Sequence, residues 1–165
     1  MRDFRSVMHI IGLLLCIEAL AMTVPFFIDL LYKNPDWDEF FLSAFVTFFI
    51  GLLLYYSFKK EKIIIKVRQA FVLTILSWIV IAIFASLPFI FTSANLNITD
   101  AFFESISGIT TTGATVINNL DGLHHGILVW RSLLQWFGGI GIIVLAMAIL
   151  PTLQIGGMQL LHMEQ

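Results

Sequence analysis

Four long apolar segments, separated by short polar connections, make up most of the chain. They cover residues 7–31, 40–58, 70–91 and 127–150. Each has about the 20 residues that an α-helix needs to cross the hydrocarbon core of a bilayer. The pattern therefore predicts an all-α membrane protein with four spanning helices. Pro25 is expected to kink the first helix and Pro151 to end the fourth, because proline removes a helical hydrogen bond.

Composition supports the membrane assignment. Of the 165 residues, 59% are hydrophobic and only 12% are charged, and the mean hydropathy is +0.94. A soluble domain cannot hide so much apolar surface. The net charge of −2 gives no indication of nucleic-acid binding, and the single cysteine, Cys16, cannot form an internal disulfide.

The basic residues predict the orientation. Seven of the nine would lie on one side of the membrane if the helices alternate: Arg2, Arg5, Lys59, Lys60, Lys62, Lys66 and Arg68. The positive-inside rule then places the N-terminus and the loop from Lys59 to Arg68 in the cytoplasm. The same basic loop could also bind anionic lipids. Residues 19–21 imitate a signal-peptidase site, but the apolar segment continues well beyond them, which favours a retained helix.

The pattern divides the chain into three parts. Residues 1–69 form a transmembrane hairpin with a basic cytoplasmic loop, and residues 70–151 form a unit of two spanning helices around a short one. Residues 152–165 are expected to form a cytoplasmic or interfacial tail.

The short helix is expected within residues 99–115. Thr99 is a plausible N-cap and Asp100 suits the first turn. Gly108 and the β-branched residues 109–112 disfavour further helix. From Asp100 to Ile109 the helix would be about 15 Å long, half of the hydrocarbon thickness, so it cannot span. Such a segment is tolerated at membrane depth only where it is buried in protein or lines water.

The backbone that follows this half-helix is suited to a cation. The C-terminal end of a helix is partly negative, and an extended segment can present carbonyl oxygens in place of a hydration shell. Gly113 allows backbone angles that a side chain would penalise, and the threonine hydroxyls at 110–112 could add ligands or brace the loop. The alternative is a re-entrant or surface loop in which the Thr-Gly pattern only makes a turn.

The motif FFESISGITTTGATVI, followed downstream by QWFGGIGIIVLAMAILP, resembles the first pore-loop repeat of the Trk/Ktr/HKT potassium transporter family. The resemblance implies a potassium-channel-like unit of helix, pore loop and helix, with no catalytic residues and no cofactor. Potassium would be the transported ion. The implied selectivity filter consists of Thr110, Thr111, Thr112, Gly113 and Ala114, and a glycine at 113 is the potassium-type choice, where serine is associated with sodium.

The family also implies partners. Its subunits contain four pore units, form dimers and rest on a cytosolic nucleotide-binding regulatory subunit. Only one such motif is present here, and one quarter of a filter cannot surround an ion. The chain is therefore expected to be the N-terminal part of a longer protein or to assemble as a homo-oligomer. The competing hypothesis is a non-transporting membrane interaction protein that docks to other transporter subunits.

Several polar residues are candidates for roles near the filter. Glu104 could raise the cation concentration at the pore mouth or brace the short helix. Arg131 could reach the lipid headgroups or pair with Glu104 or Asp121. Glu18 should face protein, as a relay or as a carboxyl group bonded to a neighbouring helix, whereas Asp29 is assigned to the interface.

Two further patterns complete the predictions. Adjacent His124 and His125 suggest an exposed pair in a loop, since no nearby Cys or carboxylate spacing supports a transition-metal site. Gly138, Gly139 and Gly141 are expected to let another backbone approach the fourth helix closely.

Overall fold

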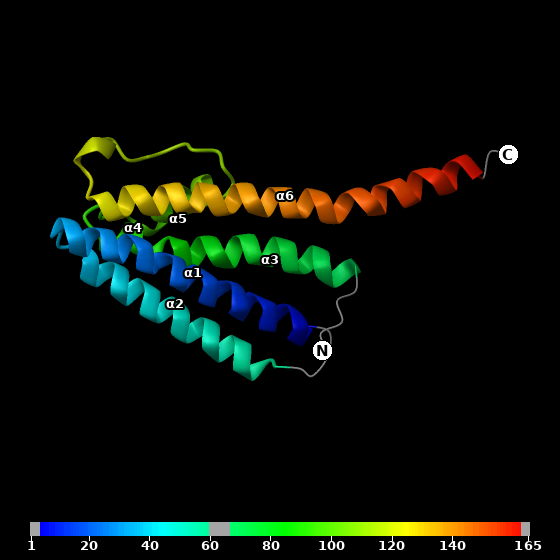
Figure 1. Cartoon of the computed structure of the whole chain (residues 1–165), viewed down its shortest axis with the longest axis horizontal. Coiled ribbons are helices and arrows are strands. Elements are labelled where there is room, and N and C mark those ends of the chain that lie inside the picture. The colour runs from blue at the N-terminus through cyan, green and yellow to red at the C-terminus, as the bar shows by residue number, and fades with distance from the viewer. Residues whose placement is uncertain (1–3, 60–66, 163–165) are drawn as a thin grey trace.

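The structure, a computed structural model, describes residues 4–59 and 67–162 of the chain. Helices account for nearly all of the regular structure in these residues (Figure 1). Their bounds are α1 Phe4–Tyr32, α2 Trp37–Ser57, α3 Val67–Ala85, α4 Leu87–Phe91, α5 Ile98–Ile109, the 3₁₀ helix η1 Leu120–Gly122, and α6 His125–His162. Most of the predicted basic loop, residues 60–66, lies outside the described residues.

The four predicted spanning helices are confirmed. α1, α2, residues 68–91 and residues 125–143 are long and apolar enough to cross a membrane. Pro25 lies inside an uninterrupted α1. The predicted end at Pro151 is wrong, because α6 continues through it to His162. Proline removes only its own hydrogen bond, and an apolar environment gives the remaining backbone groups no partner outside the helix.

The helices run side by side in a bundle (Figure 1). One end holds the turn between α1 and α2, together with α4, η1 and the start of α6. This end is called the hairpin end below. α5 also starts there, and the chain returns to it after α5 before entering α6.

Two glycines bring α1 and α2 into backbone contact. A Cβ atom added to Gly12 would lie 2.6 Å from the Tyr55 nitrogen and 2.7 Å from the Gly51 carbonyl oxygen. A Cβ atom on Gly51 would lie 3.0 Å from the Cys16 nitrogen. The distances at Gly12 are shorter than real Cβ atoms show, so that position requires glycine, and the distance at Gly51 is tighter than most real Cβ contacts. This crossing fixes how the two helices of the hairpin pack.

The main hydrophobic core lies beneath α5 and joins every α-helix of the bundle. Its fully buried members include Met22 from α1, Phe40 from α2 and Phe89 from α4. Trp130 of α6 is buried among them, and its indole N–H donates a hydrogen bond of 3.0 Å to the carbonyl oxygen of Ala85 at the end of α3. The core thus packs α5, through Ala101, against the other α-helices.

Two aspartates tie the hairpin to the later helices. Asp29 is completely buried, and its Oδ1 accepts hydrogen bonds from Asn34 (2.7 Å) and from the backbone N–H of Gly126 in the first turn of α6 (2.8 Å). Asp36 Oδ2 accepts from the backbone N–H and hydroxyl of Ser93 (3.0 and 2.6 Å) and lies 2.8 Å from His124 Nδ1. Asp29 is therefore a buried structural anchor near the end of α1, and its position at the membrane interface stays a prediction.

Candidate functional site

The short helix α5 begins two residues earlier than predicted. Asn97 has an extended backbone, and its side chain accepts a 2.9 Å hydrogen bond from the backbone N–H of Asp100. Thr99, the predicted N-cap, lies inside the helix. Asn is among the strongest N-cap residues, and its amide also bonds the Asp100 carboxylate at 2.8 Å. The cap is therefore Asn97.

α5 is a half-length helix that ends in the middle of the bundle. Its 12 residues span about 18 Å. Its last residue, Ile109, contacts Gly138 of α6, which lies about 20 Å along that helix from its start. The chain therefore enters from the hairpin end, stops halfway and turns back (Figure 1).

A Schellman motif ends the helix. The backbone N–H of Thr111 donates to the Gly108 carbonyl oxygen at 2.9 Å, and that of Thr112 donates to the Ser107 carbonyl oxygen at 3.0 Å. Thr111 adopts the left-handed conformation, φ 59°, that this motif requires and that glycine usually supplies. Two carbonyl groups of the last turn are satisfied in this way, so the chain can leave the helix without exposing them.

The predicted filter residues form one continuous, exposed segment. Thr110, Thr111, Thr112, Gly113 and Ala114 are all exposed in the single chain. Gly113 has φ 74°, as predicted from its freedom to adopt a positive φ. Among the described residues, no hydrogen bond reaches the carbonyl oxygens of Thr112 and Gly113. These two oxygens are therefore available to a ligand.

Side chains of α5 hold this segment in place. The Ser107 hydroxyl donates a 2.6 Å hydrogen bond to the Ala114 carbonyl oxygen. The Thr110 hydroxyl donates to the Ile106 carbonyl oxygen at 2.7 Å and lies 2.9 Å from the Thr112 hydroxyl. The threonine at 110 therefore braces the turn, one of the two roles predicted for the hydroxyls, and the Ala114 carbonyl is already occupied.

Glu104 joins three parts of the site. It is 2% exposed. Its Oε1 accepts hydrogen bonds from the Thr115 hydroxyl (2.5 Å) and the Val116 backbone N–H (2.7 Å), while its Oε2 accepts from Arg131 Nε at 3.0 Å. Glu104 thus ties the segment leaving residue 114 to both α5 and α6.

The Glu104 contacts decide between the alternatives for Arg131. Of the three proposed partners, Arg131 binds Glu104, in an ion pair whose side chains are 16% and 0% exposed. The burial of Glu104 and its pairing favour the bracing role, because a charge enclosed with its counter-charge attracts few distant ions. Its role at the pore mouth stays a prediction.

One of the three glycines of α6 brings backbones together as expected. A Cβ atom on Gly138 would collide with the carbonyl oxygen of Ile109, at the end of α5. A Cβ atom on Gly139 would have no neighbour within 4 Å, and one on Gly141 would make only ordinary contact with Trp78. Of these three glycines, only Gly138 is needed for close backbone packing against α6.

The remaining candidate residues have distinct surroundings. Glu18 is 6% exposed and faces protein as predicted, but neither of its carboxylate oxygens has a hydrogen-bond partner among the described residues. His124 lies against Asp36 and His125 stacks on Tyr32 with 4.1 Å between ring centroids. The two histidines thus have separate structural partners.

Comparison with known proteins identifies the family of this chain. Residues 37–165, which include α5 and the exposed segment after it, match the family model TrkH, described as a cation transport protein. The chain belongs to the TrkH family. Its membership, and with it the predicted all-helical membrane fold, is confirmed.

Individual members of the TrkH family cover almost the whole chain. The Trk system potassium uptake protein TrkH of Escherichia coli K12 is 49% identical over 98% of this chain and 34% of its own length. TrkG of the same organism is 40% identical over 97% of this chain and 33% of its own length. None of these names is that of an enzyme, in agreement with the prediction.

A crystal structure of a TrkH protein has the same fold as this chain. The potassium transporter TrkH from Vibrio parahaemolyticus superposes with a TM-score of 0.86 and 46% identity, over 94% of this chain and 33% of that one. The chain therefore spans about one third of the length of its TrkH relatives. The family and the four spans place it in a bacterial inner membrane.

Proposed function

We propose that this chain contributes one selectivity-filter segment to a Trk-type potassium uptake system. Residues 110–114 would supply backbone carbonyl oxygens that replace water around a potassium ion, with no chemical change to the ion and no cofactor. The relatives named above are potassium uptake proteins, which supports the choice of ion.

The observation that carries the proposal is the exposed, braced segment at the end of α5. Its free carbonyl groups, at Thr112 and Gly113, lie next to the C-terminal end of a helix aimed at the middle of the bundle. That end is partly negative and favours a cation. Hydrogen bonds from the Ser107 hydroxyl to Ala114 and from the Val116 backbone N–H to Glu104 hold the segment in this conformation.

One such segment can cover only part of the surface of an ion. The remaining ligands would come from further filter segments, in other copies of this chain or in other pore repeats of a longer polypeptide. The exposure of residues 110–114 in the single chain agrees with this arrangement, because that face is left open to a neighbour.

The orientation and regulation follow as parts of the same proposal. The N-terminus and the basic residues 59–68 would lie in the cytoplasm, which puts the hairpin end on the periplasmic side. A cytosolic nucleotide-binding subunit would then meet the opposite end. Single cysteines introduced at Arg2 and at Asp121 test this, because only Asp121→Cys should react with an impermeant maleimide in intact cells.

Gly113→Ser is the test of the filter assignment. In the complete transporter that contains these residues, the substitution is expected to lower the preference for potassium over sodium by about tenfold, since each 1.4 kcal/mol of altered ion binding is a factor of ten. Uptake of rubidium and sodium by a host that lacks other potassium uptake systems measures the ratio. Gly139→Ser is the matched control, because Gly139 has open space around it. Unchanged selectivity in Gly113→Ser would refute the assignment.

A further inference from the structure

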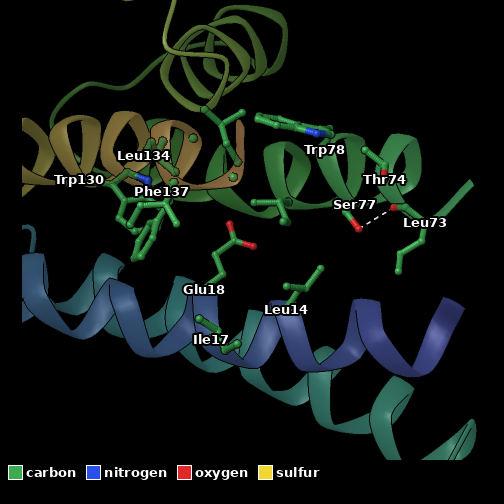
Figure 2. Close-up of a pocket in the computed structure, with 15 residues that line it drawn as sticks. Leu14, Ile17, Glu18, Leu73, Thr74, Ser77, Trp78, Trp130, Leu134 and Phe137 are labelled. Atoms are coloured by element: carbon green, nitrogen blue, oxygen red, sulfur yellow. Dashed lines mark hydrogen bonds between the residues drawn. The ribbon is translucent and has the colours of Figure 1, made fainter. Parts of the chain in front are cut away.

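A cavity of about 480 Å³ lies between α1, α3 and α6, beside the end of α5. Figure 2 shows the Glu18 side chain rising from α1 into the space between that helix and the two opposite it. The surrounding side chains are mainly apolar. The lining includes three aromatic residues, Trp78, Trp130 and Phe137. The filter proposed above, residues 110–114, uses none of these residues, and Ile109, which precedes it, lines one wall of the cavity.

Glu18 is the unusual group in this cavity. It is buried, and neither carboxylate oxygen has a hydrogen-bond partner within the part of the chain that the structure describes. A buried carboxyl group without a partner is costly inside a membrane protein. The group is therefore suited to a ligand that brings positive charge and hydrogen-bond donors.

Two hydroxyl groups on α3 also favour a ligand that donates hydrogen bonds. Thr74 donates its hydroxyl hydrogen to the Ala70 carbonyl oxygen at 2.9 Å, and Ser77 donates to Leu73 at 2.6 Å. Their hydrogens are therefore used within the helix, and their oxygens can only accept from a ligand. Thr74 and Ser77 are three residues apart on one helix, so they share a face. With Glu18, they give the cavity oxygen acceptors on two opposing walls.

We infer that this cavity binds an organic ammonium ion, a small amine with an apolar body. An ammonium group carries three N–H donors and no acceptor, which matches the carboxylate and the two hydroxyl oxygens. Aromatic side chains attract such cations through their π-electrons, and the apolar walls suit a hydrocarbon body. Bare potassium is a poorer match, because it needs more oxygen ligands than this lining supplies.

The cavity lies next to the residue that precedes the proposed filter segment. Ile109 is the last residue of α5 and directly precedes Thr110, and Gly138, which Ile109 touches, also lines the cavity. A bound amine would therefore contact the support of the filter segment from behind. The binding itself does not depend on the proposed transport function.

The test measures binding of 4-phenylbutylamine to the full protein in nanodiscs of zwitterionic lipid. Equilibrium dialysis with the radiolabelled amine should show one saturable site, and 4-phenylbutan-1-ol, its uncharged counterpart, should compete at least tenfold more weakly. This comparison needs no variant. Uptake that does not saturate, or equal competition by the alcohol, would mean partition into lipid and would overturn the inference.

Amine binding to three variants then tests whether the ligand lies in this cavity. Glu18→Gln should weaken amine binding at least tenfold, as expected when a charge-assisted hydrogen bond is lost. Ser77→Leu, which fills the cavity and keeps the carboxylate, should also weaken it. Glu39→Gln is the matched control on α2, outside the cavity lining, and should bind as the wild type does. Wild-type affinity in folded Glu18→Gln and Ser77→Leu proteins would overturn the assignment.

Discussion

Replacing Glu104 by alanine is expected to detach the return segment from α5. The carboxylate accepts from Thr115, Val116 and Arg131 at distances of 2.5, 2.7 and 3.0 Å. Alanine removes all three acceptor contacts at once. It also leaves the Arg131 guanidinium, only 16% exposed, without its counter-charge.

The size of the effect follows from these contacts. Removing one partner of a buried ion pair costs about 3–5 kcal/mol. Each hydrogen bond to the charged carboxylate contributes about 1.5–3 kcal/mol, but the three act together and do not add. A loss of about 3 kcal/mol already raises the ratio of detached to braced segment more than a hundredfold.

Two measurements on the complete transporter check this. The melting temperature of purified Glu104→Ala should fall by about 5 °C or more, and its preference for potassium over sodium should fall as the filter loosens. Glu104→Gln keeps one acceptor oxygen and should show a smaller loss. Asp121→Asn, which removes the acidic group that Arg131 does not bind, should behave as the wild type.

A double-mutant cycle separates the ion pair from the other contacts. In Arg131→Met the further cost of Glu104→Gln should be smaller than in the wild type, by about 1–3 kcal/mol of coupling. If Glu104→Ala melts at the wild-type temperature and keeps its selectivity, the carboxylate is not a brace and the reasoning fails.

Three further predictions concern the backbone. Gly138→Ala should destabilise the protein by about 1–3 kcal/mol because its Cβ meets the Ile109 carbonyl group, whereas Gly139→Ala should be neutral; thermal melting compares the two. Gly12→Ala should destabilise by a similar amount through collision with the backbone of α2, and unchanged melting would contradict the close crossing. Thr111→Gly should raise stability by up to about 1 kcal/mol, because glycine adopts φ 59° without strain, and a lower melting temperature would count against the Schellman assignment.

The sequence predicted the architecture because membrane length and hydrophobicity are local properties. Each spanning segment can be recognised without knowing its neighbours, and the stop signals around Gly108 and Gly113 also act locally. The same reasoning placed the half-helix and its end at Ile109 correctly. The cap at Asn97 could have been found too, since an asparagine three residues before Asp100 is a known capping pattern.

The partners of the charged residues could not be predicted in this way. Arg131 lies 27 positions after Glu104, and Asp121 lies nearer in the sequence, so only the packing of α5 on α6 decides between them. The contacts of Asp36 join residues 57 and 88 positions apart. Gly12 and Gly51 are isolated glycines within apolar segments, which is a weaker signal, and the helix pairing was needed to show that they lie at a close backbone contact.

The carboxylates at 29 and 36 have a consequence for anyone who shortens this protein. From the sequence alone, a truncation at the turn after α1 has no expected effect on the segment 99–115, because that segment begins some 60 residues later. It would remove Asp29, whose Oδ1 accepts a hydrogen bond from the backbone N–H of Gly126 in α6, and would cut the chain next to Asp36, which bonds Ser93. The first helix thus supports the helix that packs against the proposed filter segment, and experiments on that segment need the entire N-terminal hairpin.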